Sequence, residues 1–350
     1  MAIPIVDSHI HLFAESHLPT LAWYTPDGPL TTQHSVDEYR EATNEATCLR
    51  GFIFLEVDRI SSVEQSGENK HGWTHALDEV SYLARIAAGT PVQGEGHKPS
   101  DKDLVLGIIP WAPVPGGPEV LEEYMALVRE RTGPEVWSKI RGVRYLVQDK
   151  PSGTMLQPAF IEGLKWLGRK GLTFDLGVDA RSGGIWQLEE AVELLGRVYG
   201  EVGEGERVKI VINHLCKPNL HLSPESTATS PDFLRWQTQV AAMAQHPATF
   251  MKLSGAFSEI PPDTPGSKPE TASLVERIQP WTDAVFDAFG PERVMFGSDW
   301  PICNVGGGSQ QTWGQWRRVA EGLLERRGLS EQQKRGFWGE VAVRAYGVAV

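Results

Sequence analysis

The sequence predicts an α/β protein built as a single (β/α)₈ barrel, or TIM barrel, over residues 1–350. Short apolar segments alternate with longer segments of helical periodicity eight times along the chain, which is the pattern of this barrel. The apolar segments are nearly continuous, as is typical of parallel strands covered on both faces. An open nucleotide-binding sheet could alternate in the same way, but no Gly-x-Gly-x-x-Gly motif follows the first strand.

Eight predicted strands form the barrel, and most of them are apolar runs with polar residues at their carboxyl ends. They are Ile3–His9, Arg50–Val57, Leu104–Trp111, Ile140–Gln148, Leu172–Val178, Val208–His214, Thr249–Ser254 and Arg293–Asp299. In the last of them, Gly297 and Ser298 allow a tight turn after the apolar run. Pro301 then prevents the strand from continuing, because proline lacks the backbone N–H of a sheet ladder.

Helical periodicity fills the segments between the strands. Ser35 is a suitable N-cap for the first helix, and apolar residues three and four apart indicate the others. The predicted helices are Val36–Ala46, Thr74–Ala88, Glu119–Arg131, Pro158–Lys170, Ile185–Tyr199, Phe233–Gln245, Leu274–Phe289 and Gln315–Arg327. We expect the long polar loops that follow strands to shape a pocket or lid at the carboxyl face; these are residues 58–72, 219–231 and 256–271.

Composition narrows the class of protein. Hydrophobic residues make up 41% of the chain, which is enough to fill a large core. The net charge of −12 argues against nucleic acid or an anionic membrane as a partner. No run of roughly 18 apolar residues predicts a membrane span, and the first residues lack a basic leader, so we expect a cytoplasmic protein. Cys48, Cys216 and Cys303 are too widely spaced for a disulfide framework or a zinc knuckle. The expected partner is a small-molecule substrate, and the sequence leaves open whether the protein forms a homo-oligomer.

His9, His11 and Asp299 are the leading candidates for a catalytic or metal site. Two histidines two residues apart face one side of a strand and can bind one divalent cation, although a hydrogen-bonded core pair would show the same spacing. A carboxylate at the end of a buried strand, such as Asp299, needs a cation, a substrate or hydrogen bonds, and an Asx-turn or helix N-cap would also satisfy it. Asp7 shares the parity of the histidines, so it could orient one of them or be a hydrogen-bonded core carboxylate.

Polar residues at or near the ends of other predicted strands point to the same face of the barrel. His214 ends the sixth strand and Lys217 follows it, while Glu56 lies at the end of the second. Arg144 lies among apolar residues of the fourth strand, where its permanent charge needs an anionic or carbonyl partner. The tryptophans that could stack on a sugar ring, or simply pack in the core or rim, are Trp23, Trp111 and Trp300.

Five motifs together resemble the amidohydrolase superfamily, in its amidohydrolase-2 type. They are Val6-Asp-Ser-His-Ile-His11, Gly142-Val-Arg-Tyr-Leu-Val-Gln148, Ile212-Asn-His-Leu-Cys-Lys-Pro218, Met251-Lys-Leu-Ser-Gly255 and Met295-Phe-Gly-Ser-Asp-Trp-Pro301. More narrowly, they resemble the branch of sugar-lactone and pyrone-dicarboxylate lactonases, which also holds decarboxylases. The resemblance implies a barrel of the metallo-dependent-hydrolase type. It also implies His9, His11 and His214 as active-site imidazoles and Asp299 as the carboxylate that activates water.

The sequence departs from the family pattern at three places. Many members carry a lysine on the fourth strand that bridges two metals, whereas this strand offers Arg144 and Gln148 and no lysine before Lys150. The expected cofactor is therefore one divalent cation held by His9, His11 and Asp299, and His214 stays open as a further ligand. Zinc is the first choice, and a metal-free site is the alternative. Asn213 stands where the branch usually has Asp, and Gly339-Glu-Val-Ala342 replaces Gly-x-Asn-Ala.

The resulting hypothesis is a hydrolase that opens a lactone ring, with a sugar aldonolactone of the rhamnono or fucono type as the preferred substrate. Asp299 would take a proton from water and His214 would assist it, while Arg144, Lys217 and Glu56 would bind the substrate. Two alternatives stay open. The first is a metal-dependent decarboxylase of an aromatic or unsaturated acid, and the second is a non-catalytic barrel used as a binding protein.

Overall fold

The predicted barrel is confirmed by a ring of eight parallel strands in a computed structural model, which describes residues 3–44, 46–64, 72–200, 202–261, 270–307 and 312–350. The strands are β1 (Ile5–Ile10), β2 (Leu49–Leu55), β3 (Val105–Ile109), β4 (Gly142–Arg144), β5 (Thr173–Leu176), β6 (Ile210–Ile212), β7 (Thr249–Leu253) and β8 (Val294–Phe296). They pair in chain order as two sheets, β1 to β3 and β4 to β8. Isolated parallel bridges join the sheets, at Ile108 with Ile140 and at Ile10 with Trp300.

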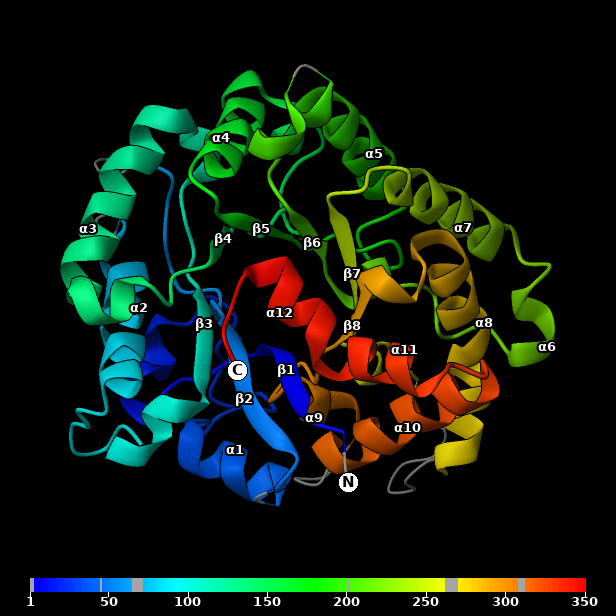
Figure 1. Ribbon diagram of the computed structural model, residues 1–350, viewed down its shortest axis with the longest axis horizontal. Helices are drawn as coiled ribbons and strands as arrows, with labels where there is room; N and C mark the ends of the chain where they lie inside the picture. Colours follow the sequence, from blue (N-terminus) through cyan, green and yellow to red (C-terminus); the bar gives the residue numbers. More distant parts are fainter. Residues whose placement is uncertain (1–2, 45, 65–71, 201, 262–269, 308–311) are drawn as a thin grey trace.

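The longer helices lie outside the ring of strands (Figure 1). They are α1 (Val36–Thr43), α2 (Thr74–Ala88), α3 (Gly117–Trp137), α4 (Pro158–Arg169), α5 (Trp186–Tyr199), α7 (Pro231–Ala244), α8 (Thr271–Phe289) and α10 (Thr312–Arg326). Each corresponds to a predicted helix. The sequence did not predict the shorter helices α6 (Pro224–Thr227), α9 (Cys303–Gly307), α11 (Glu331–Arg335) and α12 (Val341–Tyr346). No helix in the described part of the chain is long and apolar enough to cross a membrane.

Helix α12 covers the end of the barrel where the strands begin, and it lies across the middle of the ring in Figure 1. Lys209, just before β6, donates to the carbonyl of Arg344 over 2.7 Å, and Arg344 in turn donates to the carbonyl of Glu292, before β8. Apolar residues of this helix pack with inward-facing strand residues such as Ile53 and Val211. Burying these residues closes the barrel floor and leaves the opposite end for a site.

An irregularity in β1 decides which of its side chains enter the barrel. Asp7 pairs with Phe52 and Ile10 with Phe54, so three steps along β1 match two steps along β2. This extra residue reverses the alternation, as in a β-bulge. Asp7 therefore faces the helices, where its carboxylate accepts hydrogen bonds from the Tyr39 hydroxyl and the Trp313 indole N–H, both at 2.9 Å. Among the described residues Asp7 bonds no imidazole nitrogen, so it does not fix a histidine tautomer. It accepts from the backbone N–H of His9 at 3.4 Å, and the alternative, a hydrogen-bonded core carboxylate, is what the structure shows.

Most regular strands are shorter than predicted. For example, β4 covers three residues of the predicted Ile140–Gln148, and β8 covers three of Arg293–Asp299. The remaining residues continue as loops at the carboxyl face, and they carry the polar side chains. Residues 65–71 and 262–269 belong to two of the loops expected to shape a lid, and they lie outside the described residues. Cys48, Cys216 and Cys303 are buried free thiols.

Candidate active site

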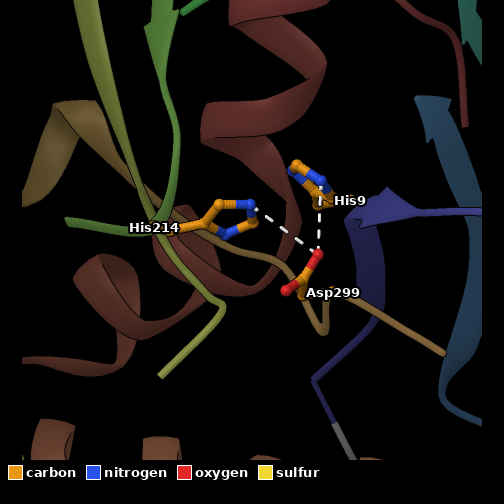
Figure 2. Close-up of side chains that lie close together, drawn as sticks. All are labelled: His9, His214 and Asp299. Atoms are coloured by element: carbon orange, nitrogen blue, oxygen red, sulfur yellow. Dashed lines mark ion pairs between the residues drawn. The ribbon is translucent and has the colours of Figure 1, made fainter. Parts of the chain in front are cut away.

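Three imidazoles surround one carboxylate oxygen at the carboxyl end of the barrel. Oδ1 of Asp299 lies 3.4 Å from Nε2 of His9, 3.4 Å from Nε2 of His11 and 3.7 Å from Nε2 of His214. Figure 2 shows His9 and His214 side by side, both pointing at the same oxygen of this carboxylate. His9 and His11 come from β1 and its end, His214 follows β6, and Asp299 follows β8. The barrel thus brings together residues that are up to 290 positions apart, as His9 and Asp299 are.

Burial sets the charges of this cluster. Asp299 is 3% exposed; burial raises the pKa of its carboxyl, but His214, His11 and Lys217 together outweigh it, so the pKa lies below its usual value. Burial lowers the pKa of His214 to about 3 and that of His9 well below its usual range. At neutral pH the site therefore presents an ionised Asp299 facing neutral His9 and His214. An ionised carboxylate beside a cavity is the state that a general base requires.

Backbone geometry and a glycine position His214. The four residues His214 to Lys217 all have φ between 45° and 61°, a left-handed turn that side chains rarely adopt and that is frequent at functional sites. Nδ1 of His214 lies 2.9 Å from the Ser254 hydroxyl. The next residue, Gly255, has φ of 65°, and a Cβ atom there would lie 2.4 Å from Nδ1 of the same imidazole. Only glycine leaves room for this ring.

A buried polar chain continues from His9 into the barrel interior. Nζ of Lys252 lies 3.3 Å from Nδ1 of His9 and donates to Asp175 over 2.6 Å. The hydroxyl of Tyr346, on α12, donates to the same carboxylate over 2.9 Å. Lys252 and Asp175 are fully buried, and burial lowers the pKa of Lys252 to about 8 although Asp175 opposes it. These polar contacts link α12, at the floor of the barrel, to the cluster around Asp299.

The donor set of this cluster fits a divalent cation. His9, His214 and Asp299 each direct one ligand atom into a space where these atoms lie within 4.8 Å of one another. Zinc bonds of about 2.0–2.2 Å in a tetrahedron separate ligand atoms by roughly 3.3–3.6 Å. The distances from the three imidazole Nε2 atoms to Oδ1 of Asp299 are similar. His11 adjoins the set, with its Nε2 3.2 Å from that of His9 and its Nδ1 3.0 Å from the Leu55 carbonyl. A proton on that Nδ1 leaves the Nε2 lone pair free, as in metal-binding histidines.

A cavity of about 270 Å³ opens onto the cluster. Its polar lining includes His11, His214 and Asp299 from the cluster and Arg144 and Lys217 from the predicted substrate-binding residues. Further polar lining residues, not among the predicted site residues, are Asp58, Gln148 and Asn213. The apolar lining consists of Phe13, Trp23, Val57, Leu146 and Ile302. This size suits a small substrate with both polar and apolar parts.

Comparison with known proteins places the chain in a family. The family model described as "Amidohydrolase" matches residues 109–348. The chain belongs to the amidohydrolase family. It is 35% identical over 347 residues to an L-rhamnono-gamma-lactonase from Scheffersomyces stipitis, with 98% of each chain covered.

Two further proteins resemble this amidohydrolase. An L-fucono-1,5-lactonase from Burkholderia multivorans is 28% identical over 272 residues, which is 77% of this chain and 76% of the relative. The crystal structure of an amidohydrolase from Burkholderia multivorans with bound zinc superimposes with a TM-score of 0.72 at 24% identity, covering 99% of this chain and 100% of the other. At this identity the superposition supports the fold alone.

In this amidohydrolase, several predicted substrate-binding residues lie outside the cavity lining. Glu56 is fully buried and accepts from the Arg144 guanidinium, so it holds that side chain in place. Trp111 packs edge-on against Tyr124, and Trp300 packs against Tyr39 in the same manner. Among the predicted tryptophans, Trp23 alone lines the cavity; its indole N–H donates to the Val57 carbonyl over 2.8 Å.

Residues that the sequence did not single out complete the site. Lys252 contacts His9 and Ser254 contacts His214, although the sequence placed both residues only within the motif of the seventh predicted strand. Asp58 and Asn213 line the cavity, but the sequence alone gave them no role. Parity along the seventh strand could have indicated Lys252, because Lys252 and Ser254 alternate with Met251 and Leu253.

Proposed function

We propose that this amidohydrolase hydrolyses the ring ester of a sugar aldonolactone. The observation that carries the proposal is the single buried carboxylate of Asp299, which three imidazoles surround at the base of a small cavity. Such a carboxylate can take a proton from water and return it to a leaving oxygen. The two lactonase relatives support a lactone as the substrate.

Hydrolysis then proceeds by proton transfers at Asp299. Its carboxylate accepts a proton from a water molecule, whose oxygen forms a bond to the lactone carbonyl carbon. The resulting oxyanion lies in a cavity lined by His214, Lys217 and Arg144, which offer N–H donors and positive charge. When the intermediate collapses, the bond between the carbonyl carbon and the ring oxygen breaks. Asp299 returns its proton to that oxygen, and the product is a hydroxy acid that ionises at neutral pH.

We also propose that one divalent cation, with zinc as first choice, takes part. His9, His214 and Asp299 would hold it, with His11 beside them, and it would polarise the carbonyl and lower the pKa of water to about 7 if it is zinc. Zinc is the ion bound in the Burkholderia multivorans amidohydrolase structure that shares this fold, which makes it the first ion to test. The tautomer of His9 adds a condition, since a histidine that binds through Nε2 carries its proton on Nδ1, next to Lys252.

The cavity favours a neutral sugar lactone over a dicarboxylate. Two cationic side chains line it, and one of them, Arg144, is already paired with Glu56. A dicarboxylate would require more unpaired positive charge, because a buried carboxylate needs a partner. The apolar residues Phe13, Leu146 and Ile302 suit the carbon face or methyl group of a 6-deoxy sugar lactone, such as a rhamnono- or fuconolactone.

A screen with a pH indicator tests this proposal, because each turnover of a lactone releases one proton. Aldonolactones and aromatic acids are supplied in parallel, and carbon dioxide is measured in the same reactions. Proton release from aldonolactones without carbon dioxide is the expected result. Carbon dioxide from an aromatic acid would instead identify the decarboxylase. Binding of aldonolactones without turnover would favour the non-catalytic barrel.

A further inference from the structure

The side chain of Asn213 is buried next to the cavity without a partner. It is 1% exposed, and neither its Oδ1 nor its Nδ2 forms a hydrogen bond with the residues that the structure describes. A buried amide without hydrogen bonds has lost its contacts with water and gained no partner in return, which destabilises the protein. Asn213 lines the cavity and directly precedes His214. A bound molecule is therefore the natural partner for this amide.

Two more polar side chains line the same cavity with free hydrogen-bonding capacity. The carboxyl group of Asp58, which follows β2, forms no hydrogen bond or ion pair within the described parts of the chain, although the backbone N–H of Asp58 donates to Glu56 over 2.6 Å. The side-chain amide of Gln148, after β4, also lacks a partner among the described residues. Burial and the nearby Glu56 raise the pKa of Asp58 to about 7, so that near neutral pH it is present in both forms and can donate or accept.

The chemistry of these groups matches hydroxyl groups. An amide offers a donor and an acceptor side by side, and a hydroxyl group is both a donor and an acceptor. An aldonolactone carries several hydroxyl groups around its carbonyl, whereas a carboxylate ligand would meet repulsion from Asp58. An aspartate at position 213 would only accept and would add a negative charge beside His214, where the oxyanion develops.

We infer that Asn213, together with Asp58 and Gln148, forms hydrogen bonds with the hydroxyl groups of the substrate. This site therefore selects hydroxylated lactones over unsubstituted ones. The inference rests on the proposed lactonase function and adds the residues that determine its specificity. A lactone without hydroxyl groups would leave the buried amide of Asn213 unpaired. Sites built to bind a substrate hydroxyl reject analogues that lack it, because the polar groups of the protein are then buried without a partner.

The test compares selectivity in Asn213→Ala, Asp58→Ala and the wild type. The measured quantity is kcat/KM for an aldonolactone divided by kcat/KM for γ-butyrolactone, which has no hydroxyl groups. We expect this ratio to fall by a factor of 10 to 100 in Asn213→Ala and by at least threefold in Asp58→Ala. Asn219→Ala, which removes a half-buried asparagine that bonds Asp232 outside the cavity lining, serves as the matched control with an unchanged ratio. Equal losses on both substrates, or no loss, would overturn the inference.

A binding measurement separates this inference from the proposed function. A 1,4-anhydroalditol has the hydroxylated ring of an aldonolactone but no carbonyl, so it binds without reacting. Calorimetry should show at least tenfold weaker binding to Asn213→Ala than to the wild type. If the wild type hydrolyses no lactone, the proposed function fails, while this binding difference still supports a site that binds hydroxyl groups. Equal affinity in both proteins, or no binding to the wild type, contradicts it. If Asn213→Ala does not fold, the same binding measurement is made on Asp58→Ala.

Discussion

Nζ of Lys252 lies 3.3 Å from Nδ1 of His9, on the side of the imidazole away from Asp299. An ammonium group can only donate, so a charged Lys252 places the proton of His9 on Nε2, facing the cluster. His9 is then a donor. If His9 instead binds a cation through Nε2, Lys252 has to be a neutral amine that accepts from Nδ1. The state of one interior lysine thus decides which role His9 plays.

The ion pair of Lys252 with Asp175 gives a prediction about stability. In the metal-free protein, where Lys252 is charged, Lys252→Met leaves Asp175 as a buried carboxylate without its cation, and breaking a buried pair in this way costs about 3–5 kcal/mol. The double variant Lys252→Met/Asp175→Asn removes both charges and keeps an acceptor for the Tyr346 hydroxyl. Urea unfolding should show that the double variant recovers most of the loss. A double variant no more stable than Lys252→Met would contradict the role given to this pair.

Gly255 is predicted to be indispensable for placing His214. An alanine there would put its Cβ 2.4 Å from Nδ1 of that imidazole, on a backbone with φ of 65°. We expect Gly255→Ala to lower kcat/KM at least 100-fold, since His214 has to move. Gly196→Ala is the matched control, because Gly196 lies in α5 with open space around it and alanine favours a helix. Wild-type activity in Gly255→Ala would disprove the steric argument.

His17 gives a prediction about pH. Its Nδ1 accepts from the Arg59 guanidinium at 2.9 Å and from the Ala14 N–H at 3.2 Å, so protonation there would break both bonds. Burial and Arg59 lower its pKa from 6.5 to about 3. Because the unfolded chain takes up this proton below pH 6.5 and the folded chain does not, stability falls as pH drops from 6.5 towards 3, by up to ~1.4 kcal/mol per pH unit.

The matched variant for this prediction is His17→Asn, whose side-chain oxygen can accept the same bonds but does not titrate. Unfolding by urea at pH 6.5 and at pH 4.5 should show a smaller loss of stability in the variant than in the wild type. The other buried groups titrate alike in both proteins, so the comparison isolates His17. An identical pH dependence in the two proteins would exclude the proposed linkage.

Metal content tests the proposed cation. The purified wild type should hold one zinc or another divalent ion per chain, measured by atomic absorption. His9→Ala and His214→Ala should each lower the content after dialysis at least tenfold, because each removes one ligand of the set. His221→Ala, a change at an exposed loop, is the control. A wild type without metal, or variants that keep it, would contradict the cation site.

The sequence predicted the barrel because its strands are buried on both faces and therefore form continuous apolar runs that stand out between helical segments. The same continuity hid where each regular strand stops, so Ile140–Gln148 was predicted for what is β4, Gly142–Arg144. Helix α12 was missed since it follows the last predicted βα unit, although Val341, Ala345 and Tyr346 have helical spacing.

The site was predictable where polar residues end apolar strands, and the structure brings His9, His11, His214 and Asp299 together as the motifs implied. Parity failed at Asp7 because an extra residue in β1 reverses the alternation, which the sequence does not reveal. The positions of Trp111 and Trp300 depend on tertiary packing that residue type alone does not indicate. The role of Asn213 depends on its burial without a hydrogen-bond partner among the described residues, which only the structure shows.

The most direct measurement is turnover of an aldonolactone by the Asp299→Asn variant beside the wild type, followed by proton release. The amide keeps the shape of the carboxylate but cannot accept a proton from water, so we expect kcat to fall at least 1000-fold while the melting temperature stays within a few degrees. A variant that folds normally and retains a tenth of the wild-type rate would contradict the assignment of Asp299 as the base.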